Sequence, residues 1–358
     1  MKSHKITLLP GDGIGPEITS VTKYILEEIG KKHNFNMIFS EHLIGGAAIK
    51  ENNTPLPKET LESCKDSDAV LMAAIGSPEF DNEIREKRPE TGLLNLRAGL
   101  DLFANIRPIK VWEPLINSSS LKPDIITGVD LIVVRELTGG IYFGQPRGEI
   151  ELDNVKRAFN TMTYSSDEID RIIKVAFAIA KGRSKRICSV DKANVLEVSQ
   201  LWRDRVEVLN SQDKSVEINH MYVDNAAMQL IKAPKQFDVL LTPNLFGDIL
   251  SDEAAMITGS IGMLPSASLS EEGKPGLFEP VHGSAPDIAG LDKANPIAMV
   301  LSAAMMLRIG LKETKAADQL EEAVNKVLRK GIRTQDLLTE KSKAVGCKEM
   351  GNELLQAL

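Results

Sequence analysis

The sequence has few of the residues that several common protein classes need. Its three cysteines, Cys64, Cys188 and Cys347, are scattered without C-x-x-C spacing, which argues against a disulfide framework or a structural zinc site and fits a reducing compartment. Aromatic residues make up only 4% and the net charge is −7, so no basic, ring-rich surface for nucleic acid is expected. The longest apolar stretch, around residues 297–307, is too short to cross a bilayer and is predicted to be a buried helix. No signal-peptide core precedes Pro10, and we expect a cytoplasmic location.

The length and the apolar pattern predict an α/β protein with two domains. A chain of 358 residues exceeds what one compact core usually needs. Strand-like runs alternate with helix-like segments, which favours α/β. Expected strands lie at 6–9, 69–75, 131–134, 186–190 and 239–242, and expected helices at 16–29 and 165–181. Residues 139–148, dense in glycine and proline, are predicted to form an irregular, hairpin-like excursion. No Gly/Ser linker is present, so we expect the two domains to be interleaved.

A glycine-rich turn near the N-terminus resembles a dinucleotide-binding fingerprint but does not match it. Residues 11–16 read Gly-Asp-Gly-Ile-Gly-Pro between an expected strand and an expected helix. The G-x-G-x-x-G pattern requires a third glycine where this chain has Pro16. Glu41, at the distance expected for a ribose-binding acid, is not clearly at a strand end. We therefore interpret the segment as a tight turn that packs strand against helix.

Two aspartates provide the most informative pattern in the chain. Asp248 and Asp252 follow an expected strand and a Pro243-Asn244 turn, within a segment that reads as helix. Four residues apart on a helix, they share a face and repel each other by about 0.2–0.5 kcal/mol, without a basic partner at helical spacing. A divalent cation held by carboxylate oxygens would offset that repulsion. The alternative is a solvated acidic face.

Basic side chains, one more aspartate and one tyrosine are the other candidates from the residues alone. Arg97, Arg107 and Arg135 could each bind a carboxylate bidentately, and together they would suit a dicarboxylate, although each alone is commonly a surface ion-pair residue. Lys192 follows an expected strand and could act as a base in a confined site, or could be an exposed loop lysine. The remaining candidates are Asp224, a metal ligand or an N-cap, and Tyr142, which lies between glycines and could simply pack.

The segment 279–290 offers a weak nucleotide-binding signal. Its small residues allow a ligand close to the backbone. Asp287 could accept hydrogen bonds from a ribose diol and would repel a 2′-phosphate, which favours NAD over NADP. The alternative is a plain loop with a capping aspartate.

Taken together, these segments resemble the β-decarboxylating dehydrogenase family, which includes isocitrate and isopropylmalate dehydrogenases. The likeness runs from the turn at Leu9-Pro10-Gly11-Asp12 to Val345-Gly346-Cys347, and no position of its core segments departs from the family pattern; those segments are 133–148, 190–196, 246–253 and 282–290. The resemblance implies two interleaved α/β domains around a mixed parallel and antiparallel sheet that is not Rossmann-type. Residues 1–102 plus 259–358 would form the NAD-binding side, and residues 103–258 the homodimer interface, with an arm after Gly139 reaching across.

The resemblance also implies roles for the candidate residues. Arg97, Arg107 and Arg135 would bind the substrate's carboxylates. Asp248 and Asp252 would hold Mg²⁺ or Mn²⁺ with the substrate, joined by Asp224 of the partner subunit. Lys192 of the partner subunit would act on the hydroxyl proton, and Tyr142 would be the acid. The implied NAD site lies in the segments 76–90 and 282–295, with the residues Gly76, Glu90, His282, Gly283, Ser284, Ala285, Pro286, Asp287 and Asn295.

The implied reaction is the NAD-dependent oxidative decarboxylation of (2R,3S)-3-isopropylmalate to 4-methyl-2-oxopentanoate and CO₂, in leucine biosynthesis. Leu93 and Leu94, with Val195 of the partner subunit, fit the role of an apolar pocket for the isopropyl group. D-Malate, tartrate and longer 2-alkylmalates remain alternative substrates, because such a pocket rejects a smaller ligand by only about 1–3 kcal/mol. Two further alternatives are a catalytically silent regulatory subunit and a non-enzymatic metal- or nucleotide-binding protein.

Overall fold

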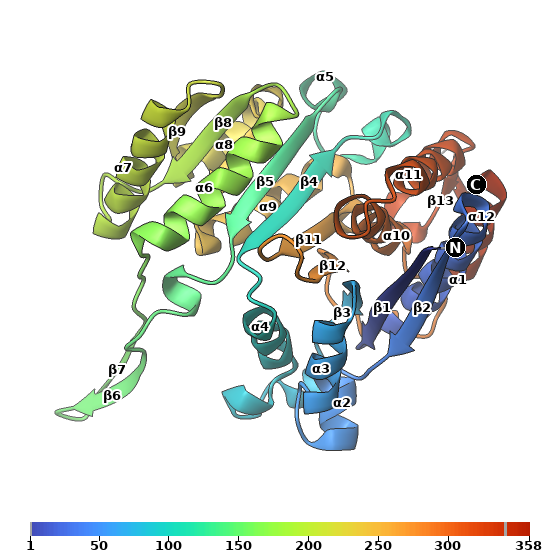
Figure 1. Cartoon of the computed structure of the whole chain (residues 1–358), viewed down its shortest axis with the longest axis horizontal. Coiled ribbons are helices and arrows are strands. Elements are labelled where there is room, and N and C mark those ends of the chain that lie inside the picture. The colour runs from blue at the N-terminus through green and yellow to red at the C-terminus, as the bar shows by residue number, and fades with distance from the viewer. Residues whose placement is uncertain (1, 340–341) are drawn as a thin grey trace. The chain divides into compact units, whose positions relative to one another are not determined.

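The chain folds into two compact units, each built from more than one segment. The computed structural model describes residues 2–339 and 342–358 (Figure 1). Unit 1 contains residues 1–102, 111–120 and 258–358, and unit 2 contains residues 103–110 and 121–257. Residues 111–120 were expected in the second domain but belong to unit 1. Two hydrogen bonds hold them there: Ser118 Oγ donates to Leu337 O (3.2 Å), and Arg333 Nη2 donates to Pro114 O (2.9 Å). Which functions belong to each unit stays a prediction.

The sheet strands of unit 1 are paired in the order β2-β1-β3-β12-β11, with both parallel and antiparallel neighbours. The strands are β1 (Lys2–Gly11), β2 (Phe35–Glu41), β3 (Ala69–Ala74), β11 (Pro265–Leu269) and β12 (Gly276–Pro280). β1 is parallel to β2 and β3, and β12 is parallel to β3, whereas β11 is antiparallel to β12. β3 is buried along its whole length, as expected for a parallel strand covered on both faces.

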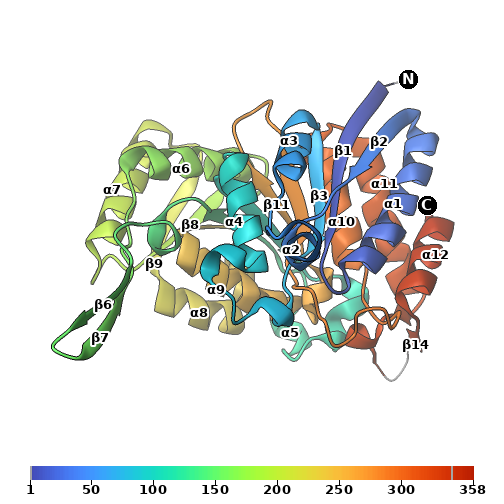
Figure 2. The same ribbon diagram turned by 90° about the horizontal axis from the view of Figure 1, so that it is seen from below.

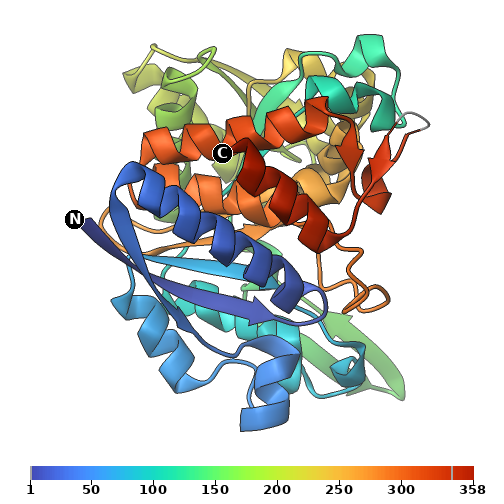
Figure 3. The ribbon, with the colours of Figure 1, turned by 90° about the vertical axis from the view of Figure 1, so that its right-hand side faces the viewer.

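Helices cover this sheet, and α1, α10, α11 and α12 pack against one another (Figure 3). The helices of unit 1 are α1 (Gly15–His33), α2 (Gly45–Asn52), α3 (Lys58–Asp66), α4 (Pro89–Gly99), α10 (Ile297–Met305), α11 (Thr314–Arg329) and α12 (Cys347–Ala357). Every residue of α10 is buried, which confirms the predicted core helix. α10 continues as a π-helical turn, Met306–Gly310. Shorter elements are the 3₁₀ turns Pro78–Phe80, Arg85–Lys87, Glu113–Ser118, Ile261–Met263 and Gln335–Leu337 and the strands β13 (Ile332–Arg333) and β14 (Lys343–Ala344).

The sheet strands of unit 2 are paired in the order β4-β5-β10-β8-β9, again with parallel and antiparallel neighbours. The strands are β4 (Ala104–Lys110), β5 (Asp130–Glu136), β8 (Arg186–Asp191), β9 (Glu217–Tyr222) and β10 (Val239–Thr242). β5, β10, β8 and β9 are parallel, and β4 is antiparallel to β5. The expected α/β class with a mixed sheet is therefore confirmed in both units.

Helices flank this sheet on both faces, α6 and α7 on one and α8 and α9 on the other (Figures 1 and 2). The helices are α5 (Pro123–Ile126), α6 (Ser166–Lys181), α7 (Glu197–Gln212), α8 (Val223–Lys232) and α9 (Asn244–Ala255), with 3₁₀ turns at Gly140–Tyr142, Pro234–Gln236 and, after α9, Met256–Thr258. α6 begins with the capping box predicted from its sequence, in which Ser165 and Glu168 satisfy each other's backbone N–H groups.

The glycine- and proline-rich segment leads into an exposed hairpin. A 3₁₀ turn, Gly140–Tyr142, is followed by β6 (Gly148–Leu152) and β7 (Val155–Phe159), which pair in antiparallel fashion. The predicted excursion is confirmed, but its hairpin strands begin only at Gly148, the last residue of the predicted segment. All ten strand residues are exposed, and the ribbon stands away from the sheet of its unit (Figure 1).

The N-terminal glycine turn is a packing feature, as interpreted from the sequence. Gly13 has a φ of +57°, and a Cβ there would lie 2.0 Å from Ser284 O. Pro16 occupies the first turn of α1, where a missing N–H costs nothing. The segment joins β1 to α1 while the loop around Ser284 lies against it.

The described cysteines and helices bear on the expectations about sulfur and hydropathy. The three cysteines are free and buried, and burial raises the pKa of each thiol to about 12. No described helix has the length and apolar content that a membrane span requires.

Candidate functional site

The candidate residues of unit 2 gather at the carboxyl ends of its parallel strands. Arg135 is the penultimate residue of β5, and Lys192 directly follows β8. Asp224 comes two residues after β9, and Asn244 two residues after β10. Carboxyl ends of parallel strands share one edge of a sheet, which is where open α/β sheets bind ligands.

Two arginines contact the aspartate pair of α9. Arg135 Nη1 donates to Asp248 Oδ1 at 2.5 Å, and Arg107 Nη1 donates to Asp252 Oδ1 at 3.1 Å. Both guanidinium groups are buried, Arg135 with only 3% of its surface exposed. Burial raises the pKa of Asp252; Arg107 opposes this rise, and the charge of Asp248 adds to it. The two strands thus supply positive charge that α9 lacks, so like-charge repulsion alone does not require a cation.

Tyr142 belongs to the same cluster. Its hydroxyl donates to Asp248 Oδ2 at 2.8 Å. Burial raises its pKa to about 12, and the bond to Asp248 adds to that effect, so the phenol stays protonated at neutral pH. Gly140 allows this placement because its φ is +77° and a Cβ there would lie 2.9 Å from the Tyr164 hydroxyl.

Arg97, the third candidate arginine, lies in unit 1. Near the end of α4, its Nη2 donates to Glu279 Oε1 at 2.8 Å, and both residues are buried. Its Nε is buried without a hydrogen-bond partner. Leu93 and Leu94 lie one turn earlier on α4 and are half-buried. The structure therefore gathers Arg107 and Arg135 in unit 2 and places Arg97 with the two leucines in unit 1.

Lys192 and Asp224 form a pair of their own. Lys192 Nζ donates to Asp224 Oδ1 at 2.5 Å, and this bond lowers the pKa of the Asp224 carboxyl. Tyr222 is the residue that precedes the first turn of α8, and no side-chain cap is present, so the N-cap alternative for Asp224 is wrong. Val195, three residues beyond Lys192, has 68% of its surface exposed.

A cavity of about 510 Å³ lies in unit 1 beside the predicted nucleotide segment. Its polar walls include His282, Asn295 and Asp336, and Asn295 Nδ2 donates to Asp336 Oδ2 at 3.0 Å. His282 Nε2 is buried without a partner, and burial lowers the pKa of this histidine. The other lining residues are Ile14, Ser260, Ile261, Gly262, Gly283, Ala285, Ile288, Lys293 and Gln335.

The remaining predicted nucleotide residues are not among those that line this cavity. A Cβ on Gly76 would lie 3.2 Å from Ser284 Oγ and 3.7 Å from Glu90 Oε1, so these three residues meet. Pro286 and Asp287 are exposed in the turn between Ala285 and Ile288, which line the cavity. The sequence did not reveal Asp12, whose carboxylate accepts bonds from the backbone N–H groups of Gly46, Ala47 and Gly76.

Other residues of the cluster were also missed from the sequence. Asn244, Ser251 and Glu136 are buried polar residues that bind Arg135, Arg107 and the backbone near Gly139, respectively. Asn244 was noticed only as part of a turn. Its position inside an apolar strand-to-helix segment was the available signal, because buried polar side chains need partners.

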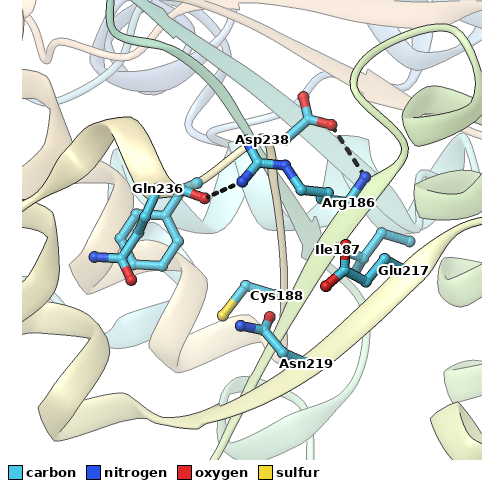
Figure 4. Close-up of a pocket in the computed structure, with 8 residues that line it drawn as sticks. Arg186, Ile187, Cys188, Glu217, Asn219, Gln236 and Asp238 are labelled. Carbon is cyan, nitrogen blue, oxygen red and sulfur yellow. Dashed lines mark hydrogen bonds between the residues drawn. The ribbon is translucent and has the colours of Figure 1, made fainter.

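A second, smaller cavity and one group of possible metal ligands lie outside this cluster. A cavity of about 80 Å³ lies at the amino ends of β8 and β10, beside Arg186, Cys188 and Asp238 (Figure 4); it is far smaller than common ligand pockets. Glu17, Asp292 and Cys347 place possible metal-ligand atoms within 4.8 Å of one another, the one such group of three among the described residues of the chain. Asp292 already accepts the N–H of Lys348 at the start of α12, which accounts for its position.

The whole chain matches one protein family. The sequence matches the family model described as isocitrate/isopropylmalate dehydrogenase over residues 5–354. It is 68% identical to a 3-isopropylmalate dehydrogenase of Prochlorococcus marinus (strain MIT 9313) and 67% identical to one of Synechococcus sp. (strain CC9605), over the full length of all chains. The crystal structure of isocitrate dehydrogenase from Methylococcus capsulatus matches with a TM-score of 0.88 and 34% identity, covering 99% of each chain. The chain belongs to the isocitrate/isopropylmalate dehydrogenase family.

Proposed function

We propose that the protein catalyses the NAD-dependent oxidative decarboxylation of (2R,3S)-3-isopropylmalate to 4-methyl-2-oxopentanoate and CO₂, a step of leucine biosynthesis. The observation that carries this proposal is the cluster in which Arg107, Arg135 and Tyr142 contact the two aspartates of α9. Full-length relatives at 67–68% identity bear the name of this activity and support the choice of substrate.

Arg107 and Arg135 are suited to bind a dicarboxylate. In the free protein each pairs with one aspartate, and each is held by a buried polar side chain of its own unit. A substrate carboxylate could replace that aspartate on the guanidinium fork without any change of charge at the arginine. We assign Arg97 the same role, because its buried Nε is without a partner.

The donor set of α9 fits Mg²⁺ or Mn²⁺. Asp248 and Asp252 offer hard carboxylate oxygens, and the charge of Asp248 contributes to the raised pKa of Asp252, which a dication would counteract. A bound cation would make the substrate's hydroxyl more acidic and stabilise the charge that develops as CO₂ leaves. Asp224 of the partner subunit is the inferred third ligand, and it would also lie against the substrate.

Lys192 and Tyr142 are the inferred proton carriers. An aspartate that turns toward a cation would release the lysine it now pairs with. Lys192 of the partner subunit would then lose its own proton to solvent, and the neutral amine would receive the hydroxyl proton. A bound NAD⁺ would accept the C2 hydride, and the bond between C3 and its carboxylate would then break to release CO₂. Tyr142, protonated at neutral pH, then donates its proton to C3 of the enol.

The unit 1 cavity is the inferred nucleotide site. Its volume of about 510 Å³ falls within the range of common small-molecule pockets, roughly 300–1,000 Å³. Asn295 and the unpartnered His282 Nε2 offer hydrogen bonds to a base or ribose. An exposed carboxylate at Asp287, between cavity-lining residues, favours a free ribose hydroxyl over a 2′-phosphate and hence NAD over NADP.

We infer a homodimer with shared active sites, formed through unit 2. Large apolar side chains on α8 and α9 are exposed, Met228 at 60% and Ile249 at 57%, and Ile249 adjoins Asp248. The exposed β6–β7 ribbon adds Ile150, Leu152 and Val155. Such apolar surface in a folded unit is typical of an interface with another chain. A partner seated here would bring a second Lys192, Asp224 and Val195 toward the acid pair.

Steady-state NADH formation with 3-isopropylmalate tests the function. We expect turnover that EDTA abolishes and that Mg²⁺ or Mn²⁺ restores. D-Malate, tartrate and longer 2-alkylmalates should be turned over more slowly, and isocitrate not at all. Faster turnover of any of these acids would replace the proposed substrate, and no dehydrogenation of any of them would overturn the enzymatic proposal.

A further inference from the structure

Asn244, the first residue of α9, is fully buried and uses every hydrogen-bonding position of its side-chain amide. Its Oδ1 accepts from Arg135 Nε at 3.0 Å and from Arg135 Nη2 at 2.7 Å. Its Nδ2 donates to Leu137 O at 2.9 Å and to Gly139 O at 3.1 Å. Because a guanidinium only donates and a carbonyl only accepts, a single orientation of the amide satisfies all four bonds.

The two ends of this amide reach two different parts of the cluster. The oxygen holds two of the arginine's nitrogens and leaves Nη1, the one that contacts Asp248, facing the acid pair. The nitrogen holds the carbonyls of residues 137 and 139, and this loop runs directly into the 3₁₀ turn that carries Tyr142. One side chain therefore fixes both a carboxylate-binding group and the support of the proton donor.

The same loop is also held from its other side. Glu136 is fully buried, and its carboxylate accepts from the Thr138 hydroxyl at 3.0 Å and from Gly139 N at 2.7 Å. Gly139 lies against Tyr164, because a Cβ there would be 2.4 Å from the ring. The Tyr164 hydroxyl accepts the N–H of Asn244 at 2.8 Å. The loop is thus clamped between Glu136 and Asn244.

A role confined to starting the helix does not account for this geometry. The residue that precedes the first turn of α9 is Pro243, and no side-chain cap is present. The side-chain amide of Asn244 is hydrogen-bonded to β5 and to the loop that follows it, and its four bonding positions leave none for its own helix. A purely structural residue would not need to contact both a substrate-binding fork and the proton donor's loop.

We propose that Asn244 is a positioning residue that fixes the Arg135 guanidinium and the loop before Tyr142 relative to each other. A substrate whose carboxylate is bound by Arg135 would then have its C3 within reach of the Tyr142 hydroxyl. The proposal rests on the proposed function. Asn244 itself touches neither substrate nor cofactor in this role and acts through the two residues it holds.

Steady-state kinetics can separate the effect of the amide oxygen, which holds Arg135, from that of the amide nitrogen, which holds the Tyr142 loop. Asn244→Ala should raise KM for 3-isopropylmalate and lower kcat, each by about ten-fold, the equivalent of one good hydrogen bond. In the Arg135→Lys background, the additional rise in KM should disappear, because the fork it orients is gone. In the Tyr142→Phe background, the additional fall in kcat should disappear, because no phenol remains to be positioned.

A second variant covers the case in which Asn244→Ala fails to fold. Thr138→Val keeps the shape of the loop residue but removes the hydroxyl bond to Glu136. It should lower kcat several-fold with an unchanged KM, and circular dichroism with thermal unfolding should report an intact fold. Asn219→Asp, an amide change on β9 away from the cluster, is the matched control and should leave both constants unchanged.

The outcomes distinguish this inference from the proposed function. A wild-type protein that does not turn over 3-isopropylmalate overturns the function itself. With an active wild type, equal losses from Asn244→Ala in all three backgrounds would show that Asn244 only supports the fold. A folded Thr138→Val variant with unchanged kcat would show that the loop at residues 137–139 does not position Tyr142, and would overturn that part of the proposal.

Discussion

Arg135 of β5 and Asp248 of α9 form a direct ion pair, 2.5 Å from Nη1 to Oδ1, although 113 residues separate them in sequence. In this pair the positive charge of an inferred carboxylate-binding group and the negative charge of an inferred metal ligand neutralise each other. Binding of a dicarboxylate together with a dication would exchange the partners of both, with the charge on each group still balanced. The first prediction follows from this exchange.

Asp248→Asn should weaken binding of the divalent ion and lower kcat by roughly 10²–10³-fold, the cost of losing one charged contact in a preorganised site. Titration with Mn²⁺ followed by electron paramagnetic resonance measures the affinity directly. Glu253→Gln, on the same helix, is the control and should change kcat by less than about three-fold. Equal Mn²⁺ affinity in the Asn variant and the wild type would remove Asp248 from the metal site.

Tyr142→Phe should lower kcat by roughly 10²–10⁴-fold, the range that a general acid contributes. Because burial and Asp248 raise the pKa of the phenol to about 12, the group stays protonated from pH 6 to pH 10. Deprotonation of Tyr142 should therefore produce no loss of activity below pH 10. A kcat profile over this range tests the assignment, and a Phe variant with wild-type kcat would refute it.

Lys192→Met should abolish turnover and leave the inferred dimer intact. The lysine directly follows β8 and pairs with Asp224, so its loss removes the inferred proton acceptor without opening a core. Stopped assays at pH 7.5 and light scattering after size-exclusion chromatography measure the two properties. Lys174→Met, exposed on α6, provides the control. Retained activity at neutral pH would reject Lys192 as the base.

Asp287→Lys should weaken the use of NAD relative to NADP. The exposed carboxylate lies between two cavity-lining residues, and reversing its charge removes a ribose acceptor and attracts a phosphate. The ratio of kcat/KM for the two cofactors should fall by at least about ten-fold. Glu322→Lys on α11 makes the same change of charge away from the cavity and should leave the ratio unaltered. An unchanged ratio in the Asp287 variant would count against a ribose contact.

Much of this site could be read from local pattern, because apolar runs mark buried strands and the residues just after them mark the ligand-binding edge. Lys192 and Asp224 were placed correctly after strands on that basis. The excursion of residues 111–120 into unit 1 was not predicted, because no change of composition marks it. Long-range partners such as Glu279 of Arg97, 182 residues away, could not be assigned either. Periodicity reports burial, and it says nothing about which distant side chain a buried charge will meet.

His282 should make the protein less stable at mildly acidic pH. Burial lowers the pKa of this histidine, so the folded chain holds it neutral where the unfolded chain, with an ordinary pKa near 6.5, begins to bind a proton. Above pH 6.5 the histidine is neutral in both states, and the folded state keeps its full stability. As pH falls from there toward the folded-state pKa, the free energy of unfolding decreases, because the chain takes up a proton when it unfolds. Between pH 7.5 and 5.5 the loss from this one group should not exceed about 1.4 kcal/mol. Urea unfolding of the wild type and of His282→Gln at both pH values isolates the contribution of His282 to the free energy of unfolding, because all other groups titrate alike in the two proteins. An equal loss of stability in both would show that His282 is free to take up a proton in the folded chain.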